Sequence, residues 1–302
     1  MKITVIGPGA MGLLFGGYLS QKHEVTLIGR NPQRMEQLAS QGVTIREADG
    51  SQAVFHPRAC VSASGRGYAD LILLLVKSGA SEKALEACRE LIGPDTLLMT
   101  LQNGAGHEKL LCRFADPSRV IIGTTQQGSY RLDDTGICHS GKGDTVLGAV
   151  TGDSARFAPV ADCFSQCGFP CQVSDQVQGM IWSKLMINAS SSVLSGILQT
   201  AQGYVAENEY AWRIAKKLIG EICAVASADG YPFDSEEQIA RIKRHLSLAP
   251  DGYTSIYADL KAGRPTEVSV INGAVADAGH RLGVPVPTHE LIVELVHAME
   301  QR

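Results

Sequence analysis

The chain has 302 residues, 44% of them hydrophobic and 19% charged, and its formal net charge at pH 7 is -4. This composition is typical of a globular protein long enough for two domains, and it excludes extensive disorder. The slight acidic excess argues against a nucleic-acid-binding surface, and the longest apolar run, residues 71–76, is too short to cross a membrane.

A short β-branched run, residues 3–6, leads into Gly7-Pro8-Gly9-Ala10-Met11-Gly12. This is a G-x-G-x-x-G motif that follows a predicted strand and precedes a predicted helix. In a dinucleotide-binding turn the first glycine permits a tight bend, the second lets the backbone approach the pyrophosphate, and the third lets the helix lie close to the strand. We therefore predict that Gly7 to Gly12 bind a dinucleotide, with a glycine-rich turn of another α/β protein as the alternative.

The second predicted strand, residues 24–28, ends in Gly29-Arg30. An NAD-binding fold carries an acidic residue near this point to accept hydrogen bonds from the ribose 2′-hydroxyl, but none lies between Glu24 and Glu36. The planar guanidinium of Arg30 suits the 2′-phosphate of NADP, and Arg34 is a second candidate. The sequence therefore predicts NADP rather than NAD, although an arginine here can also be a simple surface charge.

The rest of the first half alternates predicted strands with predicted helices, which favours a parallel sheet. The expected helices cover residues 32–41 and 81–92, and the expected strands cover 43–46, 53–55, 70–76, 97–101 and 120–123, with a polar stretch at 124–130. Ligands of such sheets bind outside the carboxyl ends of the strands. Gly7, Arg30, Lys77 and Asn103 all follow predicted strands, so we expect them at this edge.

The second half is predicted to be helical, because apolar residues recur there at spacings of three and four. The expected helices cover residues 180–198, 204–229, 235–246, 254–261, 268–282 and 288–301. The boundary is expected at residues 173–175. The predicted fold class is α/β, with a Rossmann-type dinucleotide-binding domain at 1–174, an all-helical substrate-binding domain at 175–302, and the active site in the cleft between them.

The eight cysteines are scattered, with no C-x-x-C pair and no histidine near the closest group, residues 163–171. We therefore expect reduced, mostly buried thiols and no metal site. The first predicted strand starts directly after Met1-Lys2, so we also expect no signal peptide and a cytoplasmic protein.

Two segments of the helical half carry candidate catalytic groups. Lys184 and Asn188 are four residues apart on one face of a largely apolar helix, where a partly desolvated lysine can act as a general acid. Glu267 begins a later helix and Ser255 opens another. Each has a simpler interpretation: a solvated lysine, a carboxylate favoured by the helix dipole, and a hydroxyl that caps a helix.

Together these features resemble the ketopantoate reductase (2-dehydropantoate 2-reductase) family nearly end to end. The resemblance rests on GPGAMG, Lys77, Gln102-Asn103-Gly104, WSKLMIN at 182–188, Ser255 and TEVSVING at 266–273. It implies that Lys184 is the catalytic general acid and that Glu267 binds the substrate's hydroxyl. It also implies that Asn103 contacts the nicotinamide ribose and helps catalysis, that Ser255 meets the substrate carboxylate, and that Asn188 holds the substrate. The resemblance further implies that Lys77 and Glu267 help to bind the cofactor, and that Asn103 and Lys184 help to bind the substrate.

The chain departs from the best-known members at two positions. Ser192 and Gln202 stand where those members carry asparagines, so Ser192 is taken as a substrate-binding residue of altered shape. The predicted reaction is NADPH-dependent reduction of ketopantoate to pantoate, toward pantothenate. The alternatives are the same chemistry on another small 2-oxo acid, a β-hydroxyacid dehydrogenase, and a dinucleotide-binding protein without activity. We expect no nucleic-acid or membrane partner, and the oligomeric state is left open, with a homodimer as one candidate.

Overall fold

The computed structural model describes residues 1–301, and its contacts divide the chain into two compact units. Unit 1 comprises Met1–Gln102 and His107–Val177. Unit 2 begins again at Gln178 and also contains the short segment Asn103–Gly106. Within the described part of the chain, no helix is both long enough and apolar enough to pass through a bilayer.

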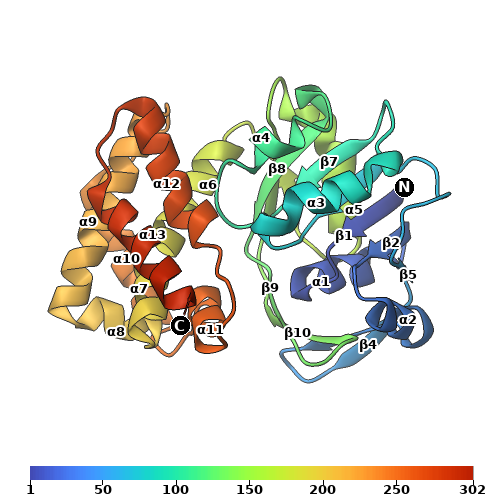
Figure 1. The fold of residues 1–302 in the computed structure, drawn as a ribbon, viewed down its shortest axis with the longest axis horizontal. Helices are drawn as coiled ribbons and strands as arrows, with labels where there is room; N and C mark the ends of the chain where they lie inside the picture. The colour runs from blue at the N-terminus through green and yellow to red at the C-terminus, as the bar shows by residue number, and fades with distance from the viewer. Residues whose placement is uncertain (302) are drawn as a thin grey trace. The chain divides into compact units, whose positions relative to one another are not determined.

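Unit 1 is built on a sheet with the strand order β12-β11-β8-β7-β6-β1-β2-β5 (Figure 1). Neighbouring strands run parallel, except that β11 is antiparallel to β8. The strands of this sheet are β1 (Lys2–Ile6), β2 (Glu24–Ile28), β5 (Arg58–Cys60), β6 (Leu71–Leu74), β7 (Leu97–Thr100), β8 (Val120–Thr125), β11 (Thr145–Ala149) and β12 (Cys171–Val173). The predicted parallel sheet is therefore confirmed, but the antiparallel β8–β11 pair was not expected.

Helices cover both faces of this sheet. They are α1 (Ala10–Leu19), α2 (Pro32–Gln41), α3 (Ser81–Ala87), α4 (His107–Leu111) and α5 (Ala158–Gln166), with 3-10 turns at Ser78–Ala80, Arg89–Leu91, Pro117–Arg119 and Ser154–Phe157. The central strand β6 shows the two-sided burial: Leu71 and Leu73 join the core that contains α1 and α5, whereas Ile72 and Leu74 join the core that contains Leu85 of α3. Its continuous apolar run follows from this burial on both faces. The helix expected at 81–92 is shorter than predicted: α3 ends at Ala87, and a 3-10 turn follows at Arg89–Leu91.

A second, smaller sheet has the order β4-β3-β10-β9. Its strands are β3 (Val43–Glu47), β4 (Gln52–Phe55), β9 (Gly128–Arg131) and β10 (Gly136–Gly141). Helix α1 contacts strands of both sheets and lies between them (Figure 1), which explains why its sequence is apolar on every side. The strand expected at 120–123 extends to Thr125 as β8, and the polar stretch that follows it contains the start of β9, which was not predicted.

Unit 2 is helical, as predicted. Its helices are α6 (Val177–Ile187), a π-helical turn (Asn188–Ser192), α7 (Val193–Leu198), α8 (Gln202–Glu207), α9 (Glu209–Ala228), α10 (Ser235–Leu248), α11 (Ser255–Lys261), α12 (Val268–Leu282) and α13 (Pro287–Glu300). Two expected helices are interrupted. The one at 180–198 contains the π turn, and the one at 204–229 breaks at Asn208, whose side chain caps α9 by accepting from the N–H groups of Tyr210 and Ala211.

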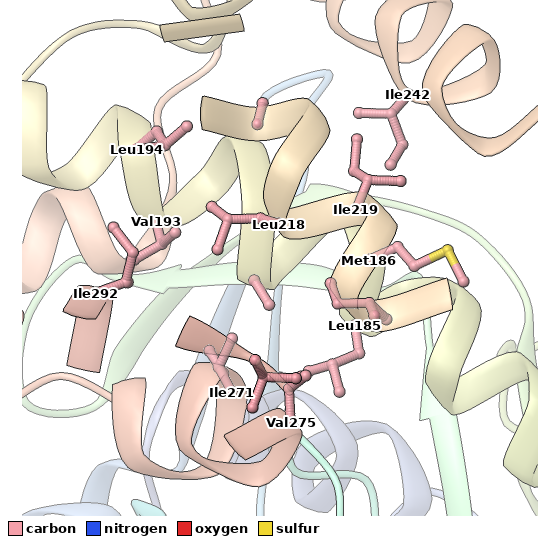
Figure 2. Close-up of a cluster of buried hydrophobic side chains, with 14 of the residues drawn as sticks. Leu185, Met186, Val193, Leu194, Leu218, Ile219, Ile242, Ile271, Val275 and Ile292 are labelled. Carbon is pink, nitrogen blue, oxygen red and sulfur yellow. The ribbon is translucent and has the colours of Figure 1, made fainter. Parts of the chain in front are cut away.

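The core of unit 2 joins these helices. Figure 2 shows Leu185 and Met186 of α6 facing Leu218 and Ile219 of α9, with Ile271 and Val275 of α12 beside them. All six side chains are at most 5% exposed. Lys184 lies on α6, and Glu267 directly precedes α12. Because this core packs α6 against α12, it sets the relative position of the two candidate catalytic groups.

Candidate functional site

The turn from β1 to α1 has the geometry expected of a dinucleotide-binding turn. Gly7 has φ +102°, and a Cβ there would lie 2.7 Å from the backbone nitrogen of Val76. A Cβ on Gly12 would lie 2.0 Å from the carbonyl oxygen of Gly7. By contrast, no described atom lies within 4 Å of a Cβ built on Gly9. Gly7 and Gly12 are thus required by the fold, whereas Gly9 leaves open space beside the backbone.

The start of α1 is suited to an anion. Gly9 is the N-cap residue, no described side chain caps the helix, and its first turn contains no acidic residue. The N–H groups of a helix start carry a partial positive charge that favours a phosphate. An open Gly9 next to this helix start fits the pyrophosphate of a dinucleotide.

The carboxyl ends of four adjacent parallel strands, β7, β6, β1 and β2, lie along the same edge as this turn. Arg30 follows β2 and Lys77 follows β6, and both side chains are exposed. Gln102 follows β7 and holds the loop after β6, because its Nε2 donates to the carbonyl of Val76 at 2.6 Å and to Ser81 Oγ at 2.9 Å. The structure therefore brings the predicted cofactor residues of unit 1 to one edge.

Arg34, the second candidate for the 2′-phosphate, contacts the segment that contains Asp134. Its side chain is largely buried, and its Nε donates to the carbonyl of Asp134 at 2.8 Å and lies 3.9 Å from the Asp134 carboxylate. Burial and the charge of Arg131 both lower the pKa of Arg34, and Asp134 opposes them. Arg34 is thus bound to the turn between β9 and β10, and Arg30 is the exposed guanidinium at the end of β2.

The segment containing Asn103 packs on α12. Gly104 has φ +98°, and a Cβ there would lie 2.1 Å from the carbonyl oxygen of Val270, so only glycine fits. The N–H of Ala105 donates to the same carbonyl at 3.1 Å. This contact holds Asn103 close to the first turn of α12, which follows Glu267. Asn103 and Gly104 therefore lie in a bend of the backbone that is anchored to α12.

Lys184 and Glu267 are brought within electrostatic range in unit 2. Lys184 lies on α6 and is partly buried, and Glu267 occupies the N-cap position of α12 without capping it through its side chain. Burial lowers the pKa of Lys184 to about 8, against the opposing effect of the Glu267 charge. A lysine with this pKa can donate a proton near neutral pH, which an ordinary surface lysine does poorly.

Asn188 and Ser192 are the first and last residues of the π-helical turn that follows α6. Asn188 is partly exposed and Ser192 is 9% exposed. Turns of this kind are rare in proteins and occur often at functional sites. The apolar periodicity did not indicate this turn, whose residues are the small polar run Asn-Ala-Ser-Ser-Ser.

Ser255 lies at the start of α11 and is exposed. It is not the cap of that helix, since the Oγ1 of Thr254 accepts from the N–H of Tyr257 at 3.2 Å. The same Thr254 hydroxyl donates to the carbonyl of Ser192 at 3.2 Å. The capping role considered for Ser255 is therefore wrong, and Thr254 connects the start of α11 to the π turn.

Unit 2 thus holds an ammonium donor, a carboxylate, two amides and two hydroxyls on neighbouring elements. Such a set can bind a small polar anion, donate a proton to a carbonyl oxygen and accept a hydrogen bond from a hydroxyl. Among residues 1–301 there is no group of three or more histidine, cysteine, aspartate or glutamate side chains arranged to hold a metal ion. All eight cysteines are free thiols, of which Cys88, Cys138, Cys167 and Cys223 are buried.

Both halves of the chain match models of one protein family. Residues 3–152 match the family described as "Ketopantoate reductase PanE/ApbA", and residues 176–300 match the "Ketopantoate reductase PanE/ApbA C terminal" family. The 2-dehydropantoate 2-reductase of Halobacterium salinarum is 29% identical over 100% of this chain and 99% of its own length.

Solved structures of similar proteins share the whole architecture. A D-mandelate dehydrogenase in a ternary structure with NADH and anilino(oxo)acetate has a TM-score of 0.92 at 29% identity, covering 100% of this chain and 99% of that one. A 2-dehydropantoate 2-reductase from Geobacter metallireducens also has a TM-score of 0.92, at 25% identity and 99% coverage of both chains.

Proposed function

This chain belongs to the ketopantoate reductase PanE/ApbA family, and we propose that it reduces 2-dehydropantoate (ketopantoate) to pantoate with NADPH, a step toward pantothenate. The observation that carries the proposal is the buried position of Lys184, which lowers its pKa to about 8, within electrostatic range of the carboxylate of Glu267. We further assign residues 1–174 to cofactor binding and 175–302 to substrate binding. The free cysteines support a reducing, cytoplasmic location.

The residues of unit 1 fit the cofactor. The turn Gly7–Gly12 and the start of α1 would hold the pyrophosphate, because Gly9 leaves open space there. Arg30 would pair with the 2′-phosphate and Lys77 would lie on the same side, with Asn103 and Glu267 serving the cofactor's reactive end. When bound, NADPH supplies the hydride that the ketone carbon receives.

Lys184 would complete the reduction. As negative charge develops on the ketone oxygen, the ammonium of Lys184 stabilises it and gives it a proton, which produces the alcohol. The neutral amine then takes a proton from solvent, so charge balances over the cycle. Ser255 would donate to the substrate carboxylate, while Asn188 and Ser192 hold the substrate's polar atoms. Asn103 would orient the reacting groups.

Glu267 separates ketopantoate from the alternative substrates. Ketopantoate carries a hydroxyl at the end away from its carboxylate, and a carboxylate side chain is a strong acceptor for such a group. The second candidate function is reduction of another 2-oxo acid, and it is favoured by the likeness to a D-mandelate dehydrogenase. That likeness extends over the whole chain at the same TM-score as the 2-dehydropantoate 2-reductase structure.

The test is a comparison of kcat/KM for NADPH oxidation with ketopantoate and with a panel of 2-oxo acids, including the ketopantoate analogue that lacks the hydroxyl. We expect ketopantoate to be preferred in the wild type. Glu267→Ala should then lower kcat/KM for ketopantoate by a factor that corresponds to about 2–4 kcal/mol of transition-state stabilisation. The value for the analogue should fall much less. A higher kcat/KM for an aryl 2-oxo acid such as benzoylformate would favour the second candidate.

Asp234→Ala is the matched control for this variant. The Oδ1 of Asp234 caps α10 in the same unit by accepting from the N–H of Glu237 at 2.7 Å. Its removal should lower the free energy of unfolding by about 1 kcal/mol. It should change kcat/KM for ketopantoate and for the analogue by the same factor. If Glu267→Ala behaves in the same way, Glu267 only stabilises the start of α12. The main reason for assigning ketopantoate as the substrate would then be lost.

A further inference from the structure

The π-helical turn is held by a side chain that the proposed mechanism does not use. Asn272 lies on α12 and is completely buried. Its Nδ2 donates to the carbonyl oxygen of Ala189, inside the π turn, at 2.8 Å. The other hydrogen of the same Nδ2 points to Nδ1 of His289, 3.1 Å away. Asn272 therefore links α12 and α13 to the turn that carries Asn188 and Ser192.

The hydrogen-bonding roles in this network follow from its ends. A backbone carbonyl can only accept, so the amide of Asn272 must donate to Ala189. At the other end, Nε2 of His289 lies 3.2 Å from the carbonyl of Leu218 on α9, so that nitrogen must donate. Burial lowers the pKa of His289, which keeps the ring neutral with its proton on Nε2. Its Nδ1 is then free of hydrogen and accepts from Asn272.

His289 is itself fixed in place. It is completely buried, and its backbone N–H donates to the Glu221 carboxylate at 3.1 Å, beside that of Thr288 at 3.0 Å. The start of α13 is thus attached to α9 independently of Asn272. The amide of Asn272 consequently has one orientation, and in that orientation it reaches the π turn.

The π turn affects where the substrate-binding side chains point. In a continuous α-helix, Ser192 would be rotated about 80° around the axis from Lys184, eight residues earlier. A wider π turn uses more residues for each revolution, which reduces that rotation and brings Lys184, Asn188 and Ser192 toward one face. A sequence such as this can also form an ordinary α-helix, so the wider turn needs partners from other elements. Thr254, the N-cap residue of α11, donates to the carbonyl of Ser192, and Asn272 of α12 donates to that of Ala189.

We propose that Asn272 is a positioning residue, which holds the π-helical turn at Ala189 so that Asn188 and Ser192 are presented to the substrate beside Lys184. This proposal rests on the proposed function for its effect on catalysis, but the structural role of Asn272 can be tested without it. Core filling does not account for the residue. Its Oδ1 is buried with no partner among the described residues, a cost that a leucine of similar volume would avoid.

The test compares Asn272→Leu, and Asn272→Ser should the first fold poorly, with Asn208→Ala as the control. Asn208 caps α9 in the same unit by accepting from the N–H groups of Tyr210 and Ala211, so its loss destabilises unit 2 without removing the hydrogen bond from Asn272 to the π turn. For the Asn272 variants we expect KM for ketopantoate to rise about tenfold or more. The dissociation constant for NADPH should stay within about twofold, because the residues proposed for the phosphates lie in unit 1. Asn208→Ala should change neither.

Hydrogen exchange provides a readout that does not need the reaction. Amides of residues 186–198 should exchange faster in the Asn272 variants than in the wild type and in Asn208→Ala at equal distance from the melting temperature. Unchanged exchange in this segment would overturn the proposal, as would faster exchange with an unchanged KM. Should the wild type fail to reduce ketopantoate, faster exchange would still support the attachment of the π turn, and only the proposed function would fail.

Discussion

The lowered pKa of Lys184 predicts a specific pH dependence for the reduction. A general acid must carry its proton, so the rate follows the protonated fraction of Lys184. With a pKa of about 8, this fraction is about nine-tenths at pH 7 and about one-tenth at pH 9. We therefore expect kcat/KM to fall about tenfold between these two pH values, and about tenfold again by pH 10. An unperturbed lysine would keep kcat/KM nearly constant over this range.

Glu267 supplies an internal check on the same prediction. Burial lowers the pKa of Lys184 and the charge of Glu267 opposes that effect. Glu267→Gln removes the charge with little change in shape, so the pKa of Lys184 should fall further. The alkaline limb of the pH profile should then move to lower pH. Because Glu267 is also proposed to bind substrate, the position of the limb is the informative quantity, whereas the height of the profile is not.

The assay is the initial rate of NADPH oxidation at limiting ketopantoate, at constant ionic strength, with the dissociation constant for NADPH measured at each pH. Lys184→Arg is the matched control, since a guanidinium stays protonated throughout and should remove the limb while leaving a much lower rate. The reverse oxidation of pantoate should show the opposite dependence and rise with pH. A wild-type profile that is flat to pH 10, or a limb that survives in Lys184→Arg, would refute the assignment of Lys184 as the acid.

Two further predictions concern the cofactor. Arg30→Ala should raise KM for NADPH about tenfold or more and leave KM for NADH within about twofold, since only NADPH carries the 2′-phosphate that a guanidinium binds; steady-state kinetics with both cofactors checks this, and equal changes would identify Arg30 as a surface charge. Asn103→Ala should lower kcat by about tenfold or more and raise KM for NADPH, because it removes an amide proposed to orient the reacting groups; unchanged values of both would leave Asn103 as only part of the Gly104 turn.

Local sequence signals predicted those elements of unit 1 whose structure depends on their own residues. The glycines of 7–12 required one backbone geometry, and Gly7 and Gly12 have it. The apolar run at 71–76 required a strand buried on both faces, and β6 is one. In the second sheet, β3 and β4 were predicted in this way, as strands at 43–46 and 53–55, but β9 and β10 were not. Strand β10 pairs in parallel with β3, far away in the sequence, and its residues show no alternation of apolar and polar side chains that would indicate a strand.

The helical half shows the same limit at its candidate site. The spacing of apolar residues predicted one helix from 180 to 198, because a π turn changes the period only over a few residues. Lys184 and Asn188 could be placed on one face from spacing alone. The approach of Lys184 to Glu267, by contrast, depends on the packing of α6 and α12 through a shared core, and only the family resemblance pointed to it.

Three features of the candidate site share a physical property, which is that each costs stability. The π turn gives up regular helical hydrogen bonding, Asn272 buries an amide oxygen without a partner among the described residues, and Lys184 buries a charge whose pKa falls as a result. Each costs stability, and a sequence chosen only for folding would avoid all three. They occur together around one small region of unit 2, where Asn272 contacts the π turn that directly follows the helix of Lys184. The occurrence of three destabilising features in one region indicates a functional site, because no single helix of the fold requires all three. This argument is independent of the family resemblance.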